Sequence, residues 1–161
     1  MARQLVADPK EFESLRGGGA SVFDVEHVDD RQEFSVTCEK MNDLGIPADS
    51  QGQIFDVVAA VLHLGNVGII RDQEMKAANY APSLREAGGY AMVHDPRRAL
   101  MNAADLLGVD ANRLKNALVM RPAIKAGGPP IGPQSVAKAI GLKKSLAETL
   151  CVTDRKRPRA S

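Results

Sequence analysis

The residues able to carry chemistry are few and widely separated in this chain. Three histidines, His27, His63 and His94, stand at no metal-ligand spacing from one another or from a cysteine. His63 follows Asp56 by two turns of an expected helix, and we interpret it as a structural histidine bonded to a nearby polar group. No serine or cysteine lies in a recognisable nucleophile motif. The residues by themselves therefore predict no catalytic site and no metal site.

Phosphate chemistry has no recognisable motif here either. The sequence contains no Gly-x-x-x-x-Gly-Lys-Ser/Thr loop, and Gly17–Gly19 lacks the lysine and the helix that would make it a phosphate cradle. Helix capping explains the acidic pair Asp29-Asp30. Cys38 and Cys151 are isolated, so we expect two reduced thiols and neither a disulfide nor a Cys-x-x-Cys metal pair.

The bulk composition is that of an ordinary globular domain. The chain has 161 residues, 44% of them hydrophobic, and a net charge of +1, which favours neither nucleic acid nor a membrane as a partner. The longest apolar run, Val57–Leu62, is too short to span a bilayer, and no signal peptide is visible. We expect a cytoplasmic protein. The basic stretch Arg155–Arg159 could be a nuclear-localisation or nucleic-acid patch, although we prefer a solvated terminus.

Helix signals begin close to the N-terminus. Asp8 predicts the cap of a short helix that ends near Leu15, because a proline follows it at the first helical position. Asp29 or Asp30 predicts the cap of a second helix, which ends at Gly45.

The third helix is expected to organise the fold. It is predicted from about Asp49 or Ser50 to Leu64. One half of the helix circumference carries small residues, among them Ala59 and Ala60. Large apolar residues cover about half of its circumference. These residues are Ile54, Phe55, Val57, Val58, Val61, Leu62 and Leu64. So wide an apolar face needs neighbours on most sides, which indicates the central helix of a larger fold.

The remaining chain reads as further helices joined by long loops. Val67–Ile70 predicts a short strand and Arg71–His94 a long surface loop. Asp95, Asp110 and Ser135 each predict the cap of another helix.

The predicted fold is mainly α: an irregular multi-helix domain around a central apolar helix, with at most short strands. Helical spacing places Ala117 and Ile140 among the core-facing residues of the later helices. Arg121–Gln134 holds four prolines and three glycines, so its helix content must be low. We expect one domain over residues 1–150 and a polar, basic, disordered tail over 151–161.

Several short segments keep a recognisable order along the chain. Gln53–Asn66 reads Gln-Ile-Phe-Asp-Val-Val-Ala-Ala-Val-Leu-His-Leu-Gly-Asn and resembles the myosin-head pattern in which Ile-Phe and a few variable residues precede Ala-Ala-Ile/Val-Leu-His-Leu-Gly-Asn. Other segments resemble the same family at the expected places. They are Asp29–Thr37, Met41–Ile46, Ala103–Asp110, Leu114–Leu118 and Ser145–Ala147. Together they cover nearly the whole chain.

The resemblance implies a piece of a myosin motor head from the upper 50 kDa subdomain, between the two nucleotide switch segments. The family is an actin-activated ATPase, but its phosphate loop and both switches are absent from this sequence. ATP cleavage needs a phosphate cradle, Mg²⁺ coordination and a positioned water. ATP and Mg²⁺ are therefore expected in the complete family head and not in this chain.

The resemblance also implies a partner. Myosins bring an actin-contacting loop to the place of Arg121–Gln134, and the candidate contacts here are Arg121, Lys125, Pro129, Pro130 and Ile131. The position where many family members carry an acidic or phosphorylatable residue is Gly128, which offers neither charge nor hydroxyl. The alternative is a plain proline-rich connector. Arg71–His94 stands where a second, more variable loop approaches actin.

Three functions remain open at this point. The first is an incomplete motor that belongs with the rest of a myosin head, on actin filaments in the cytoplasm. The second is a non-enzymatic actin-binding module, and the third is a helical scaffold or nuclear protein that uses the basic tail. Removed from a head, the third helix should leave apolar surface exposed, and we expect a poorly soluble or partly molten product.

Overall fold

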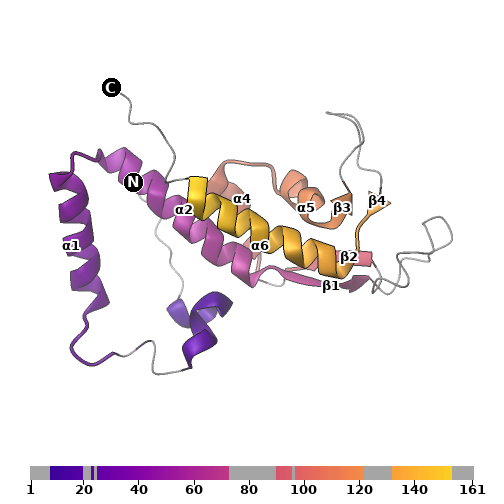
Figure 1. Ribbon diagram of the computed structural model, residues 1–161, viewed down its shortest axis with the longest axis horizontal. Helices are drawn as coiled ribbons and strands as arrows, with labels where there is room; N and C mark the ends of the chain where they lie inside the picture. Colours follow the sequence, from indigo (N-terminus) through magenta and orange to yellow (C-terminus); the bar gives the residue numbers. More distant parts are fainter. Residues whose placement is uncertain are drawn as a thin grey trace.

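The computed structural model describes residues 8–19, 23, 25–72, 90–95, 97–121 and 132–153. Helices dominate these residues, and the strands form two short antiparallel hairpins, so the predicted mainly α fold is confirmed. The elements are η1 (Pro9–Glu11), η2 (Glu13–Gly18), α1 (Asp30–Asp43), α2 (Ala48–Asn66), β1 (Gly68–Asp72), β2 (Tyr90–His94), α4 (Ala99–Leu107), α5 (Ala111–Val119), β3 (Met120–Arg121), β4 (Gly132–Pro133) and α6 (Val136–Thr153). Figure 1 shows α2 and α6 side by side through the middle of the molecule.

The N-terminal segment forms two short 3-10 helices, where the sequence predicted one helix. Asp8 caps the first as expected, because its carboxylate accepts a hydrogen bond of 2.9 Å from the amide of Lys10. Phe12 lies between η1 and η2 and is only 3% exposed. One buried aromatic side chain thus fastens this segment to the body of the protein.

Helix α1 begins and ends where its sequence indicated. The carboxylate of Asp29 accepts hydrogen bonds from the amides of Arg31 and Gln32, at 2.9 and 3.2 Å. Gly45 follows the helix with φ +74°, a conformation that costs glycine little. Figure 1 shows α1 projecting away from the other helices.

A buried glutamine joins α1 to α2. The side-chain amide of Gln51 donates to Asn42 Oδ1 at 2.7 Å and to the carbonyl of Ile46 at 2.8 Å. The rings of Phe34 and Phe55 also meet, with centroids 5.0 Å apart. The contact between the two helices is otherwise slight, and every residue of α1 keeps some exposure to solvent.

The start of α2 and its buried face both differ from the expectation. The helix begins at Ala48 and has no side-chain cap, so neither Asp49 nor Ser50 caps it. Ala59 and Ala60, on the half opposite the large apolar residues, are 2% and 0% exposed. Among the large apolar residues, Leu64 is fully buried and Val58 is exposed. The others are partly buried.

Small residues on the neighbouring helix explain this reversal. Helix α4 packs against α2 more extensively than any other helix does, and its Ala103 and Ala104 are fully buried. Alanine side chains are small enough to be enclosed completely where helices pack, and both helices bury alanines. The amphipathic pattern of a sequence is judged mainly by its large apolar residues, so it pointed to the other face.

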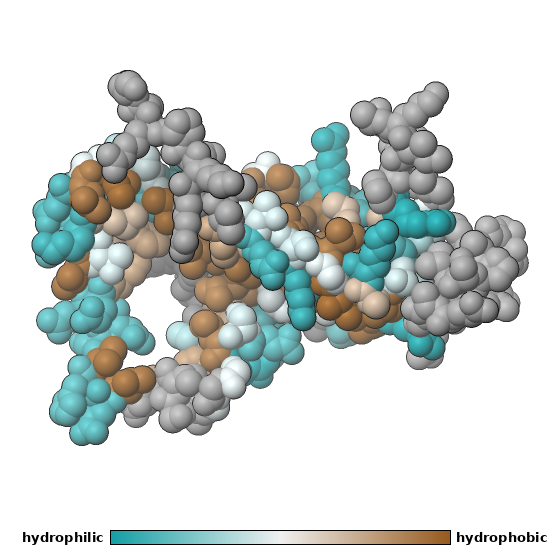
Figure 2. All heavy atoms as spheres, viewed as in Figure 1, coloured by the Kyte–Doolittle hydropathy of each residue, from teal (hydrophilic) through white to brown (hydrophobic). Residues whose placement is uncertain are grey.

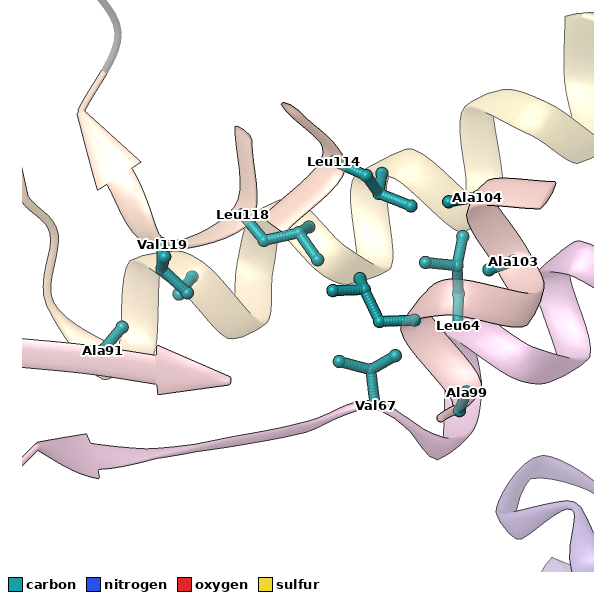
Figure 3. Packing of buried hydrophobic residues seen from close by; sticks show 11 residues of the cluster. Leu64, Val67, Ala91, Ala99, Ala103, Ala104, Leu114, Leu118 and Val119 are labelled. Carbon is teal, nitrogen blue, oxygen red and sulfur yellow. The ribbon is translucent and has the colours of Figure 1, made fainter. Parts of the chain in front are cut away.

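The core lies where α2, α4, α5 and α6 meet the first hairpin. Figure 3 shows side chains from α2, α4, α5 and β2 pointing into one cluster. Its buried members are Leu64, Val67, Ala91, Ala99, Leu100, Ala103, Ala104, Leu114, Leu118, Val119 and Ala139. The core prediction is wrong for two residues: Ala117 is exposed, and Ile140 is 37% exposed. Val119, two residues after Ala117, and Ala139, next to Ile140, lie in the core.

Local caps fix the later helices as well. The carboxylate of Asp95 accepts from the amides of Ala99 and Leu100 at 2.7 and 2.9 Å, so it caps α4 from further upstream than expected. Asp110 caps α5 through the amide of Arg113 at 2.8 Å. Helix α6 extends to Thr153, past the boundary expected after residue 150, and the rest of the tail lies outside the described residues.

The sequence predicted a loop over Arg71–His94, but the two ends of this segment belong to strands that pair with each other. Strands β1 and β2 pair antiparallel, with Gly68 opposite His94 and Asp72 opposite Tyr90. A Cβ at Gly68 would lie 2.9 Å from the carbonyl oxygen of His94, so only glycine fits there. The predicted short strand is confirmed as β1, and residues 73–89 lie outside the described part.

Apolar side chains reach the surface on the outer side of the helices. Figure 2 shows hydrophobic residues among the charged ones on one face of the molecule. Phe34, Leu44 and Val58 are 53%, 77% and 52% exposed. This supports the premise that the third helix is incompletely covered, while solubility itself stays a prediction.

No helix in the described ranges is both long and apolar enough to cross a membrane.

The buried alanine face predicts an asymmetric response to the same added side chain. Ala60→Leu should destabilise the protein by about 1–3 kcal/mol, because a larger side chain has no room at a fully buried alanine position. Val58→Leu is the matched control on the exposed side of α2 and should change stability by no more than about 0.5 kcal/mol. Urea denaturation of the three proteins measures the difference. Equal midpoints for Ala60→Leu and the original chain would contradict this packing.

Candidate functional site

The structure describes only the base of the loop that the sequence singled out. Arg121 is half-buried at the end of β3, where it pairs with Gly132, and Met120 pairs with Pro133. The other candidate contacts lie outside the described residues. They are Lys125, Pro129, Pro130 and Ile131. The described ends of Arg121–Gln134 are extended and not helical, as the proline content indicated.

Gln134 anchors the end of this loop to the helix before it. Its side-chain amide donates to the carbonyl of Leu118 at 2.6 Å, and its backbone amide donates to the carbonyl of Val119 at 2.9 Å. The residue is 1% exposed. A buried side chain with a satisfied donor specifies a single arrangement more strongly than an exposed one, so the two ends of the loop are held at a defined separation.

The same residue connects the loop base to the first hairpin. The carbonyl of Gln134 accepts a hydrogen bond of 2.9 Å from the amide of Ala91 in β2. Next to it, Ser135 forms an antiparallel bridge with Tyr90. The end of β2 therefore lies beside the residues that follow β4, and Figure 1 shows β2, β3 and β4 near one another. The sequence indicated two loops, but only the tertiary structure places their bases together.

Two polar atoms at this junction keep unused hydrogen-bonding capacity. The Nε of Arg121 and the Oε1 of Gln134 are buried and lack a hydrogen-bond partner among the described residues. The guanidinium still has its other donors, and it is a fixed cation at the mouth of the loop. This chemistry suits an anionic or carbonyl-bearing partner group and offers no proton-transfer machinery.

The signature His63–Asn66 lies at the opposite end of the first hairpin and has a structural role. Asn66 Oδ1 accepts a hydrogen bond of 2.7 Å from the amide of Glu13, and its Nδ2 donates to the carbonyl of Glu11 at 3.0 Å. Arg97 donates to that same carbonyl at 3.2 Å. The side-chain amide thus pairs with the backbone of the N-terminal segment much as a neighbouring strand would.

Further contacts fix the end of α2 against η2 and α6. A Cβ at Gly65 would lie 3.4 Å from Ser14 Oγ, an ordinary van der Waals distance, so η2 packs directly beside the end of α2. The Nζ of Lys143 donates to the carbonyls of Gly65 and Val67 at 3.3 and 2.8 Å, where a cation also favours the C-terminal end of α2. Burial lowers the pKa of Lys143; Glu13 opposes that effect and Lys144 adds to it. No sequence motif pointed to Lys143.

His63 is a structural residue, as interpreted, but its contact is aromatic. Its ring meets that of Phe12 edge to face, with centroids 5.3 Å apart. Burial lowers the pKa of His63 below its ordinary value of 6.5, and the charge of Asp95 partly opposes the shift. The neutral imidazole is therefore the form that this packing favours.

No group of three or more histidine, cysteine or acidic side chains gathers in the described ranges. Gly17 lies in η2, where an added Cβ would meet no atom within 4 Å. Cys38 is half-buried in α1 and Cys151 exposed in α6, and both are free thiols.

Comparison with known proteins identifies where these features recur. Residues 2–152 match the model of the family described as myosin head (motor domain). The chain is 29% identical to myosin IB heavy chain of Dictyostelium discoideum over 80% of its length, and 29% identical to myosin-52 of Schizosaccharomyces pombe over 91%. It is 33% identical to myosin-14 of Arabidopsis thaliana over 76%. These matches span 11%, 9% and 7% of the relatives' own lengths.

The buried His63 predicts a stability that depends on pH. Its folded pKa is depressed, so the unfolded chain binds the extra proton more readily. The free energy of unfolding should be highest above pH 6.5 and should fall as the pH drops below it. His63→Phe keeps an aromatic contact with Phe12 and should flatten the dependence between about pH 7.5 and 5.5.

His27→Asn is the control for this experiment. The side chain of His27 is 89% exposed in a turn with φ +65°, a conformation that asparagine tolerates. This variant should keep the full pH dependence, measured by denaturant titration at each pH. A slope that is unchanged in His63→Phe would show that another group causes it.

Proposed function

This chain belongs to the myosin head (motor domain) family, and we propose that it is a segment of an actin-based motor head that presents an actin-facing surface. In this proposal it acts as helical scaffold for that surface and hydrolyses no ATP by itself. It would act in the cytoplasm, associated with the actin cytoskeleton and with the remainder of a motor head. The chain spans about a tenth of its relatives' length, which supports the idea of a part working within a larger whole.

The observation that carries the proposal is the meeting of the two hairpins at one end of the fold. Arg121 closes β3 there, and the buried Gln134 fixes the other end of segment 122–131. A loop whose ends are held in place loses less conformational entropy on binding than a free one. The junction therefore supports a preorganised attachment point for a filament surface that carries carboxylates.

The exposed apolar side of α2 supports the scaffold part of the proposal. Val58 and Phe34 are more than half exposed, and the α1–α2 joint leaves α1 with little cover. Surface of this kind in a motor head would be covered by other parts of the same head. The proposal thus assigns the helices to positioning and the two hairpins to partner contact.

The proposal assigns no ATP chemistry to these residues, and two observations support it. The sequence holds no phosphate loop with its lysine, and no metal-binding cluster lies among the described side chains. ATP and Mg²⁺ would belong to the complete head, in which other residues supply them with ligands.

A non-enzymatic actin-binding module is the second candidate. The base of the 122–131 loop is closed entirely by β3, β4 and Gln134, which all belong to this chain. The binding surface could then form without the rest of a head. The third candidate, a scaffold or nuclear protein that uses the basic tail, depends on residues 155–159, outside the described part.

The purified chain is expected to pellet with actin filaments at tens of micromolar. Arg121→Gln should weaken this binding by about tenfold, the cost of one charge-assisted contact. Arg113→Gln removes the same charge from an exposed position on α5 and is the matched control. Co-sedimentation at low and physiological salt measures both variants. No pelleting above background would rule out the binding module, and equal losses in both variants would indicate nonspecific charge attraction.

Mg-ATP should not bind the isolated chain. Calorimetric titration with millimolar nucleotide is expected to give only heats of dilution, because the sequence contains no phosphate-loop motif. A saturable isotherm with one site per chain would overturn the assignment of ATP chemistry to other parts of the head.

A further inference from the structure

The N-terminal segment is held to the core through one short run of residues. Phe12 is 3% exposed, and its ring meets that of His63 edge to face at a centroid distance of 5.3 Å. Asn66 binds the backbone on either side of Phe12. Its Nδ2 donates to the carbonyl of Glu11 at 3.0 Å, and its Oδ1 accepts from the amide of Glu13 at 2.7 Å. One aromatic side chain and two backbone groups of a tripeptide are therefore recognised together.

Two cationic side chains lie beside this tripeptide. Arg97 Nη1 donates to the carbonyl of Glu11 at 3.2 Å. Burial lowers the pKa of Lys143, and the charge of Glu13 opposes that shift, so the ammonium and this carboxylate attract each other. The end of α2 thus favours an acidic segment with an aromatic residue at its centre.

The chain between this segment and α2 adds little to its attachment. No described residue from 19 to 47 is buried, and the hydrogen bond from the amide of Val28 to the carbonyl of Val25 is local. Helix α1 is joined to α2 at Gln51, away from the tripeptide. The contacts that hold the segment therefore depend on the segment and its site alone, and another molecule's segment can make the same ones.

We propose that the end of α2 is a peptide-binding site for an acidic, phenylalanine-centred segment, and that residues 8–18 of a second copy of this chain occupy it in exchange for the chain's own. Such an exchange makes a dimer without any new surface, because the contacts within one molecule become contacts between two. The chain's own segment has a high effective concentration, so exchange increases as the protein concentration rises. Neither actin nor the rest of a motor head takes part in this interaction.

A synthetic peptide of residues 8–18 tests the recognition. Phe12→Ala in the full chain weakens the internal segment and should open the site to this peptide, with saturable one-to-one binding in calorimetry. Phe12→Ala in the peptide should weaken this binding at least about tenfold, because the buried aromatic side chain is lost. Leu15→Ala in the peptide is the matched control, since Leu15 is 39% exposed, and should change the affinity by no more than about twofold.

A second pair of variants tests the site itself. Asn66→Ala, added to the Phe12→Ala chain, should lower the affinity for the peptide about tenfold, because two hydrogen bonds are lost. Asn102→Ala makes the same change at an exposed position of α4 and should leave the affinity unaltered. No saturable binding, or equal binding by these two chains, would overturn the peptide-binding site.

Exchange between copies is tested in chains that keep Phe12, so the result does not depend on how Phe12→Ala folds. A Cβ at Gly65 would lie 3.6 Å from Ser14 Cβ, a separation that suits a disulfide. Cys38 and Cys151 are first replaced by alanine in both chains. Gly65→Cys in one chain and Ser14→Cys in the other should then cross-link on mild oxidation. Mass spectrometry identifies the disulfide between the two different chains, and its yield should rise with protein concentration.

Gly141→Cys is the matched control for Gly65→Cys. Gly141 is exposed on α6, and a Cβ there would meet no atom within 4 Å. The pair of positions 14 and 65 should give at least about tenfold more cross-linked dimer than the pair 14 and 141. Equal yields from both pairs, or peptide binding without cross-linking above the control, would overturn the exchange between copies.

Discussion

The close contact between α2 and α4 sets the positions of everything else in this fold. Ala59 and Ala60 of α2 and Ala103 and Ala104 of α4 are all buried, and α4 is the helix that packs most extensively on α2. At the end of α2, Leu64 joins Ala103 and Ala104 in the core. The remaining helices and the first hairpin pack around that point, while the large side chains of α2 are left toward the outside.

The end of α2 then fastens two other parts of the chain. His63 meets Phe12, Asn66 pairs with the backbone of the N-terminal segment, and Lys143 reaches the last carbonyls from α6. Every residue of the signature His63–Asn66 thus has a packing or hydrogen-bonding role. This explains why the signature marks the myosin family so clearly while containing no catalytic chemistry.

The junction proposed for partner contact and the contacts that hold the N-terminal segment lie at different ends of the first hairpin. The junction around Gln134 lies at one end of β1 and β2, and the hydrogen bonds between Asn66 and the N-terminal segment lie at the other end. One rigid core thus separates the site that holds the N-terminal segment from the site that positions Arg121. A motor head needs this kind of rigidity, because a binding surface can act on distant parts only through elements that do not deform independently.

The sequence by itself determined the local features. Asp29 and Asp110 cap helices and Gly45 ends one, since these roles depend on neighbours within a few residues. The signature also indicated the family and the mainly α fold. It could not show which face of α2 is buried or that Gln134 bonds to both the end of α5 and β2. Those outcomes depend on which distant segment comes closest, and only the tertiary structure decides that, because side-chain volume and buried hydrogen bonds are satisfied between segments far apart in the chain.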